Sequence, residues 1–180
     1  MKQQRRLVAA LLLFAGWIAL CSAALFYLGQ RHYGEFADAQ LWQADNLSLS
    51  VLGLPVEEGV TLLHVMTDGC PCNYRARTHQ RVLAQDPSLA EVQHHVINAE
   101  VLAQSGFQLP ATPAVLVFIN GKLHYAGPFA SGPLCALDES FILPILKQRV
   151  ILPGLWLNAD ATACRCQVKP LLPGYTILAE

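Results

Sequence analysis

The sequence has little charge and no excess of either sign. Only 14% of its 180 residues are charged, and 12 lysines and arginines stand against 13 aspartates and glutamates, with no basic stripe. Because binding to nucleic-acid phosphates needs such a basic surface, we expect no nucleic-acid partner. Long apolar runs are also scarce: after residue 28, no stretch is both long and free of charge. Further membrane spans beyond the N-terminal region are therefore not expected.

The one long apolar run lies near the N-terminus, where Leu7 to Leu28 carries no charge. At a rise of about 1.5 Å per residue this run crosses a hydrocarbon core of about 30 Å, so it predicts one transmembrane helix. Three basic residues, Lys2, Arg5 and Arg6, precede it, and acidic residues follow it. By the positive-inside rule, the N-terminus stays in the cytoplasm and the rest of the chain is exported.

A cleaved signal peptide would share this pattern of basic residues followed by an apolar run. The run is longer than the usual 7–15 residues, however, and no small-x-small site is followed by a polar segment. We therefore expect a retained signal anchor over residues 1–30. The predicted location is a bacterial inner membrane, crossed once, with the C-terminal part in the periplasm.

The rest of the chain has the size of one domain. Residues 31–59 are predicted to form a stalk and N-terminal extension. Its segment 30–43 either continues the first helix or packs on the domain, and a brief edge strand is expected between Ser48 and Pro55. The hydrophobic patterns predict strands over 60–66, 91–97, 114–119 and 122–126, and helices over 73–85, 99–104 and 137–150. Pro144 must kink the last helix or lie in its first turns. Residues 151–180 form a C-terminal extension.

Two cysteines flank Pro71 where the strand over 60–66 gives way to the helix over 73–85. A helix N-terminus favours a thiolate over a thiol, which makes a cysteine nucleophilic. Buried free cysteines and metal ligands are the alternatives for Cys70 and Cys72. The pair is thus a candidate reactive site.

The order of strands and helices, the cysteines after the first central strand and the segment Ala111-Thr-Pro-Ala114 resemble the thioredoxin fold over residues 60–150. The resemblance implies an α/β fold, with a central mixed sheet flanked by helices. It also implies a cis peptide bond at Thr112–Pro113 and an extended peptide substrate held by these two residues beside the cysteines. The whole chain then resembles membrane-anchored, periplasmic thiol-disulfide oxidoreductases.

The cysteine motif departs from the family pattern, in which two residues separate the cysteines and an aromatic residue precedes them. Here only Pro71 lies between Cys70 and Cys72, and Gly69 precedes them. A disulfide between these two cysteines would close a small ring away from relaxed geometry, which makes such a bond more reducible. We therefore expect a more oxidising or isomerase-like pair than that of an ordinary thioredoxin.

The same spacing recurs in Cys164-Arg165-Cys166. If this segment is extended, both thiols lie on one face, because side chains two residues apart in a strand point the same way. A redox relay with Cys70 and Cys72 is the favoured use. Structural disulfides and a thiolate site for Cu(I) or Zn(II) stay open. A lone Cys135 is expected to serve packing.

The histidines are expected to be mostly structural. His64 and His124 fall within predicted strands, His79 falls within the helix over 73–85, and His94 and His95 point to opposite faces of one strand. Copper-delivery relatives of thioredoxin combine two cysteines with a distant histidine. That resemblance implies an alternative copper site made by Cys70, Cys72 and His124.

The sequence thus predicts a membrane-tethered thiol-disulfide oxidoreductase or isomerase that acts on extracytoplasmic protein thiols. Cys70 would attack a substrate disulfide, Cys72 would resolve the mixed disulfide, and a separate redox partner would exchange electrons with the pair. No bound cofactor is expected, because the disulfide itself carries the electrons. Two alternatives stay open: a copper-delivery module, and a non-catalytic assembly protein with structural cysteines.

Overall fold

The computed structural model describes residues 2–36, 47–56 and 58–169. The chain divides into two units, of which the first is the helix α1 (Lys2–His32). Within it, Gln3–Gly29 has a mean hydropathy of 2.3 and is long and apolar enough to cross a membrane. A transmembrane helix in this region is therefore supported by length and composition.

The second unit begins at Tyr33, where a short strand, β1 (Tyr33–Glu35), follows α1 directly. It pairs antiparallel with β8 (Thr162–Cys164), and Phe36 is buried in the core. Within the segment 30–43, residues 30–32 thus continue the first helix and residues 33–36 pack on the domain. The rest of the predicted stalk, residues 37–43, lies outside the described residues.

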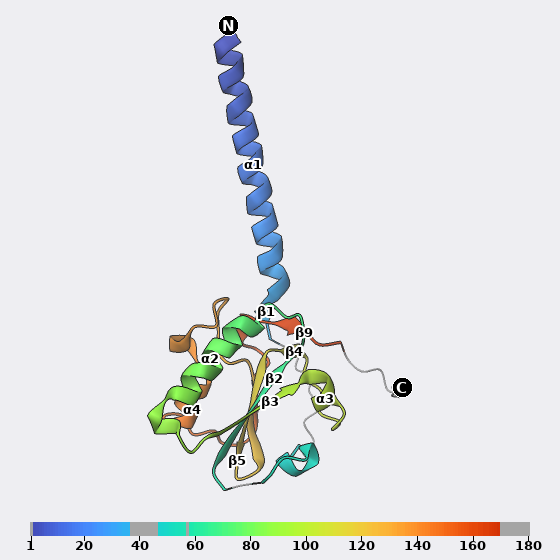
Figure 1. Cartoon of the computed structure of the whole chain (residues 1–180), viewed down its shortest axis with the longest axis vertical. Helices are drawn as coiled ribbons and strands as arrows, with labels where there is room; N and C mark the ends of the chain where they lie inside the picture. The colour runs from blue at the N-terminus through green and yellow to red at the C-terminus, as the bar shows by residue number, and fades with distance from the viewer. Residues whose placement is uncertain (1, 37–46, 57, 170–180) are drawn as a thin grey trace. The chain divides into compact units, whose positions relative to one another are not determined.

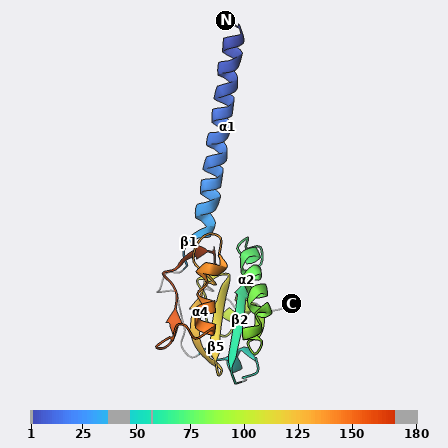
Figure 2. The same cartoon turned by 90° about the vertical axis from the view of Figure 1, so that its left-hand side faces the viewer.

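A five-stranded mixed sheet forms the centre of the second unit. Its order is β3 (Gln93–Asn98), β2 (Val60–Met66), β5 (Ala114–Ile119), β6 (Lys122–Gly127) and β7 (Trp156–Leu157). β2 is parallel to β3 and antiparallel to β5, which lies beside it (Figure 2). β5 and β6 form the predicted hairpin, in which Asn120 and Gly121 both take positive φ, as such a turn requires.

Helices cover both faces of this sheet (Figure 1). α2 (Asn73–Gln85) and α4 (Ile142–Leu146) pack on one face through Ala76, Leu83, Ile142 and Ile145. α3 (Ala99–Ala103) packs on the other through Leu102. The alternation of buried side chains along β2 and β5 supplies the two cores. The predicted fold class is confirmed: a thioredoxin-like α/β fold preceded by one N-terminal apolar helix.

Two predicted elements are wrong. The segment expected as an edge strand forms a 3₁₀ helix, η2 (Leu49–Leu52), which ends at Gly53 in the left-handed region. The helix expected over 137–150 is split into η4 (Leu137–Glu139) and α4, with Ser140 between them. Pro144 explains the split, because a helix that began earlier would bring its ring against the carbonyl of Ser140. Instead, the Ser140 hydroxyl accepts hydrogen bonds from the backbone N–H groups of Ile142 and Leu143.

Candidate redox site

The loop between β2 and α2 places Cys70 and Cys72 at the N-terminal end of the helix. Gly69 takes a φ of 73°, which allows the chain to turn after β2. The Asn73 side chain donates a hydrogen bond of 2.8 Å to the carbonyl of Thr67, and the backbone N–H of Asn73 donates to the carbonyl of Cys70. These contacts hold the loop against the first turn of α2, as the strand-to-helix pattern predicts.

The cysteines of the two Cys-x-Cys motifs are bonded to one another crosswise. Cys70 forms a disulfide with Cys166, and Cys72 forms one with Cys164. The expected Cys70–Cys72 disulfide is therefore wrong for this state of the molecule, and the small-ring argument does not apply to it. The segment that carries Cys164 and Cys166 therefore lies beside the N-terminal end of α2.

Thr112 and Pro113 lie beside this cluster. The Thr112–Pro113 peptide bond is cis, as the resemblance implies. The Sγ atom of Cys70 is 3.7 Å from the carbonyl oxygen of Thr112. The hydroxyl of Thr112, which is fully buried, donates to that of Thr67 over 2.9 Å. The structure thus brings together the predicted residues Cys70, Cys72, Thr112 and Pro113.

The chain's own C-terminal segment covers the backbone edge at Thr112. β4 (Ala111–Thr112) pairs antiparallel with β9 (Cys166–Gln167), and Thr112 lies opposite Cys166. The backbone N–H of Val168 adds a hydrogen bond of 2.9 Å to the carbonyl of Pro110. Figure 1 shows β4 and β9 near β1, at one end of the sheet. We call residues 162–168 the strap.

Arg165 lies between the two strap cysteines, and the sequence did not single it out. A Cβ atom at Gly34 of β1 would lie 3.0 Å from Nη2 of Arg165, so the glycine leaves room for the guanidinium group. The Arg165 Nε atom is buried without a hydrogen-bond partner. The tertiary pairing of β1 with β8 brings Gly34 and Arg165 together, so the local sequence gives no sign of this contact.

His124 is not brought to the cysteines. It lies on β6 beside the Phe118 end of β5, and Phe118 pairs with Thr61 near the start of β2, whereas the cysteines follow the end of β2. Among the described residues, the ligand atoms near Cys70 and Cys72 that could share a metal ion include Cys166 but no histidine. The alternative ligand set of Cys70, Cys72 and His124 is therefore not assembled.

Other histidines belong to the core. His64 Nε2 and His94 Nδ1 are 3.0 Å apart, and the His64 ring stacks on Phe129. Burial lowers the pKa of His64 to about 3, with a smaller contribution from the nearby His94. His79 is buried on α2, with its Nδ1 atom 3.8 Å from Cys135 Sγ.

Cys135 is a free thiol outside the disulfide cluster. Burial raises its pKa to about 11, so the reactive thiolate form is disfavoured there. This agrees with its expected role in packing.

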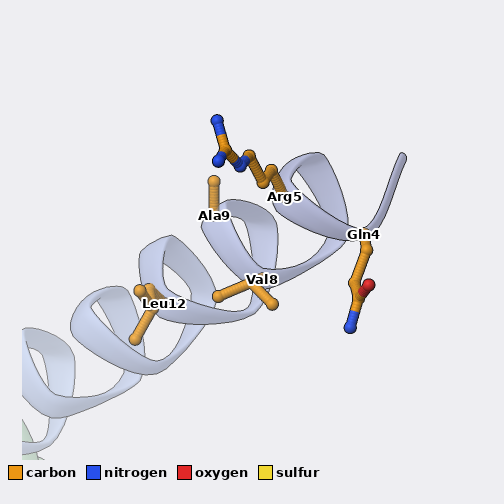
Figure 3. Close-up of a pocket in the computed structure, with 5 residues that line it drawn as sticks. All are labelled: Gln4, Arg5, Val8, Ala9 and Leu12. Atoms are coloured by element: carbon orange, nitrogen blue, oxygen red, sulfur yellow. The ribbon is translucent and has the colours of Figure 1, made fainter. Parts of the chain in front are cut away.

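An open indentation lies on α1, lined by residues from successive turns of the same helix: Gln4, Arg5, Val8, Ala9 and Leu12 (Figure 3). The close-up shows these side chains pointing outward from one helix rather than enclosing a space. Because a ligand site needs convergent groups around a concave space, this indentation is not the functional site. The disulfide cluster is the candidate site.

Two disulfides thus lie at the N-terminal end of α2 in a thioredoxin-like fold, an arrangement that supports a function of redox type. The sequence profile of a family described as "Domain of unknown function (DUF6436)" matches residues 39–168, and the chain belongs to this family. No curated protein matches the chain.

Among solved structures, the chain is similar to Trxlp from Edwardsiella tarda EIB202, with 17% identity and a TM-score of 0.34, over 43% of this chain and 74% of that one. It is also similar to the thioredoxin Mala s 13 of Malassezia sympodialis, with 15% identity and a TM-score of 0.37, over 52% and 79% of the two chains. The fold class stated above rests on the strand order and connectivity of this chain.

Proposed function

We propose that this protein is a thiol-disulfide oxidoreductase, tethered to a bacterial inner membrane by α1, that acts on protein thiols in the periplasm. The observation that carries the proposal is the meeting of four cysteines at the N-terminal end of α2, beside Thr112 and Pro113. The Cys70–Cys166 and Cys72–Cys164 disulfides are the oxidised form, and both can accept electrons.

The exposure of the four cysteines suggests the direction of attack. Cys70 and Cys72 are only 8% and 1% exposed, whereas Cys164 and Cys166 are half-buried. An incoming thiolate therefore reaches the strap sulfur atoms more readily. The leaving group is then Cys70 or Cys72, whose thiolate gains stabilisation from the positive end of the α2 dipole.

The reduction of the Cys70–Cys166 disulfide by a dithiol partner takes two steps. A thiolate of a dithiol partner attacks Cys166 Sγ, a mixed disulfide with Cys166 forms, the Cys70–Cys166 bond breaks, and Cys70 leaves as a thiolate. The second thiol of the partner then attacks the partner's first sulfur atom, which is bonded to Cys166 in the mixed disulfide. This step releases Cys166 as a thiolate, which takes up a proton. The partner loses two electrons and becomes a disulfide, and the protein gains those two electrons.

Thr112 and Pro113 would hold the substrate once the strap is released. In the oxidised form, the backbone edge of β4 is paired with β9. That pairing spans only two residues of each strand, so we expect an extended polypeptide to replace β9 once the Cys70–Cys166 bond is broken. Cys70 Sγ, which lies 3.7 Å from the Thr112 carbonyl oxygen, would then be next to the bound polypeptide.

A second candidate is a non-catalytic assembly protein with structural disulfides. The burial of Cys70 and Cys72 favours it, because inert structural cysteines are buried. The two disulfides also connect segments that are more than 90 residues apart, where a structural bond stabilises most.

The test is turnover by the full-length protein in detergent micelles. A dithiol peptide serves as electron donor and the disulfides of insulin serve as acceptor. We expect catalysed electron transfer to fall at least about tenfold in Cys70→Ser/Cys166→Ser, because the remaining Cys72 is the more deeply buried helix cysteine. The matched control, Cys135→Ser, removes a thiol outside the cluster and should leave the rate unchanged.

Wild-type disulfides that stay intact in the presence of the dithiol donor, with no turnover, would overturn the proposal in favour of the assembly role. Equal rates in the wild type and in Cys70→Ser/Cys166→Ser would also contradict it.

A further inference from the structure

We propose that the fully reduced protein binds one Zn²⁺ ion through the thiolates of Cys70, Cys72, Cys164 and Cys166. The Sγ atoms of Cys70, Cys72 and Cys166 all lie within 4.8 Å of one another, and the Sγ atom of Cys164 is bonded to that of Cys72. Three sulfur atoms thus share one small volume at the N-terminal end of α2, and the fourth, that of Cys164, is bonded to one of these three.

The size of this cluster suits a tetrahedral zinc site. Zinc–sulfur bonds of about 2.3 Å in a tetrahedron place the sulfur atoms about 3.8 Å apart. The most separated of the three sulfur atoms need to move together by only about 1 Å, from the 4.8 Å limit to that spacing. After reduction, the bonded pairs separate toward the same spacing, because two thiols cannot remain at bonding distance.

The chemistry of the donors also favours zinc. Within the described part of the chain, the group of candidate ligands around Cys70 contains sulfur atoms and no carboxylate or imidazole. A site with four thiolates is the common closed, structural type for Zn²⁺. Four thiolates and one Zn²⁺ carry a net charge of minus two, which the positive end of α2 partly offsets.

The state that binds metal is reached by a balanced reduction. Each disulfide takes two electrons and two protons, so two equivalents of a phosphine reductant, oxidised with water to the phosphine oxide, convert both disulfides into four thiols. Zn²⁺ then displaces the thiol protons as it binds, which makes its affinity rise with pH. This inference does not depend on the proposed oxidoreductase activity, because metal binding needs reduced thiols and no turnover.

The experiment uses the full-length protein in detergent micelles, reduced with a phosphine under nitrogen, treated with a chelator and desalted. Co²⁺ is the probe, because its sulfur-to-metal charge-transfer band and visible bands report the number of thiolates and the tetrahedral geometry. We expect one Co²⁺ per chain with the spectrum of a four-thiolate site, displaced by one equivalent of Zn²⁺. The oxidised protein should bind none.

Variants separate this site from its alternatives. Cys166→Ser should weaken Co²⁺ binding at least about tenfold, since even the loss of an outer-shell partner costs 10–100-fold. His124→Ala and Cys135→Ser should bind as the wild type does. A missing charge-transfer band in the reduced wild type would overturn the proposal, and so would binding that is lost in His124→Ala but kept in Cys166→Ser. Turnover measured on metal-free protein reports separately on the proposed activity.

Discussion

The two disulfides are nested, one loop inside the other. Their contributions to the free energy of unfolding should therefore not be additive. Cys70–Cys166 connects residues 96 apart, and Cys72–Cys164 connects residues 92 apart. In the chain-entropy relation, a loop of about 100 residues contributes about 4.7 kcal/mol. Once one disulfide is present, the other closes only the ring of about six residues between the two bonds, which contributes about 2 kcal/mol by the same relation.

Removing either disulfide should therefore lower the free energy of unfolding by about 2 kcal/mol, and removing both should lower it by about 7 kcal/mol. The variants are Cys70→Ser/Cys166→Ser, Cys72→Ser/Cys164→Ser and their combination. Pulse proteolysis in urea measures this free energy on the full-length protein in detergent, because it cleaves only the unfolded domain.

A different pairing predicts a different pattern. If each Cys-x-Cys motif were bonded to itself, each disulfide would close a three-residue ring worth about 1.5 kcal/mol. Cys70→Ser/Cys166→Ser would then break both bonds, and the variant with four substitutions would be no less stable than this one. Equal stability of those two variants would refute the crossed, nested pairing.

Three further substitutions test the core, each with the same unfolding measurement. Burial lowers the pKa of His64 from 6.5 to about 3, so the unfolded chain binds the extra proton and stability falls as the pH drops from 6.5 toward 3. From pH 7 to pH 5, the free energy of unfolding should fall by about 2 kcal/mol less in His64→Leu than in the wild type. An equal fall in both proteins would contradict a neutral, buried His64. Gly127→Ala would place its Cβ 2.8 Å from both Asn158 Cβ and the Tyr125 hydroxyl oxygen. We therefore expect the free energy of unfolding to fall by about 1–3 kcal/mol. An unchanged value would mean that these neighbours move aside freely. Leu83→Ala removes a fully buried side chain of α2 and should cost about 2–5 kcal/mol, whereas a cost below about 1 kcal/mol would argue against the packing of α2 on the sheet.

The parts of the fold that were predicted well have strong local signals. β2 and α2 have the expected bounds, because one is a compact apolar run and the other is a polar periodic segment that ends before Asp86-Pro87. The β5–β6 hairpin follows from Asn120-Gly121. The helix over 137–150 was expected with Pro144 either at a kink or in its first turns, and Pro144 does lie in the first turn of α4. The predicted start and end are wrong, because apolar spacing alone does not show where a helix begins and ends.

The candidate site was only half predictable. The position of Cys70 and Cys72 between a strand and a helix depends on neighbouring residues alone, so the sequence predicts it. Their bonding partners are not local, because four cysteines allow three pairings and sequence alone does not choose among them. The choice depends on the antiparallel pairings of β9 with β4 and of β8 with β1, which bring together segments far apart in the chain.

The position of the strap near the C-terminus also determines when the native disulfides can form during synthesis. Cys70 and Cys72 are synthesised more than 90 residues before their partners, so they leave the ribosome as two neighbouring thiols with no strap to meet. An oxidant that reaches them early can join them to each other, to Cys21 or Cys135 of the same chain, or to a foreign thiol. Wherever such early oxidation occurs, the native connections require thiol-disulfide exchange after Cys164 and Cys166 arrive.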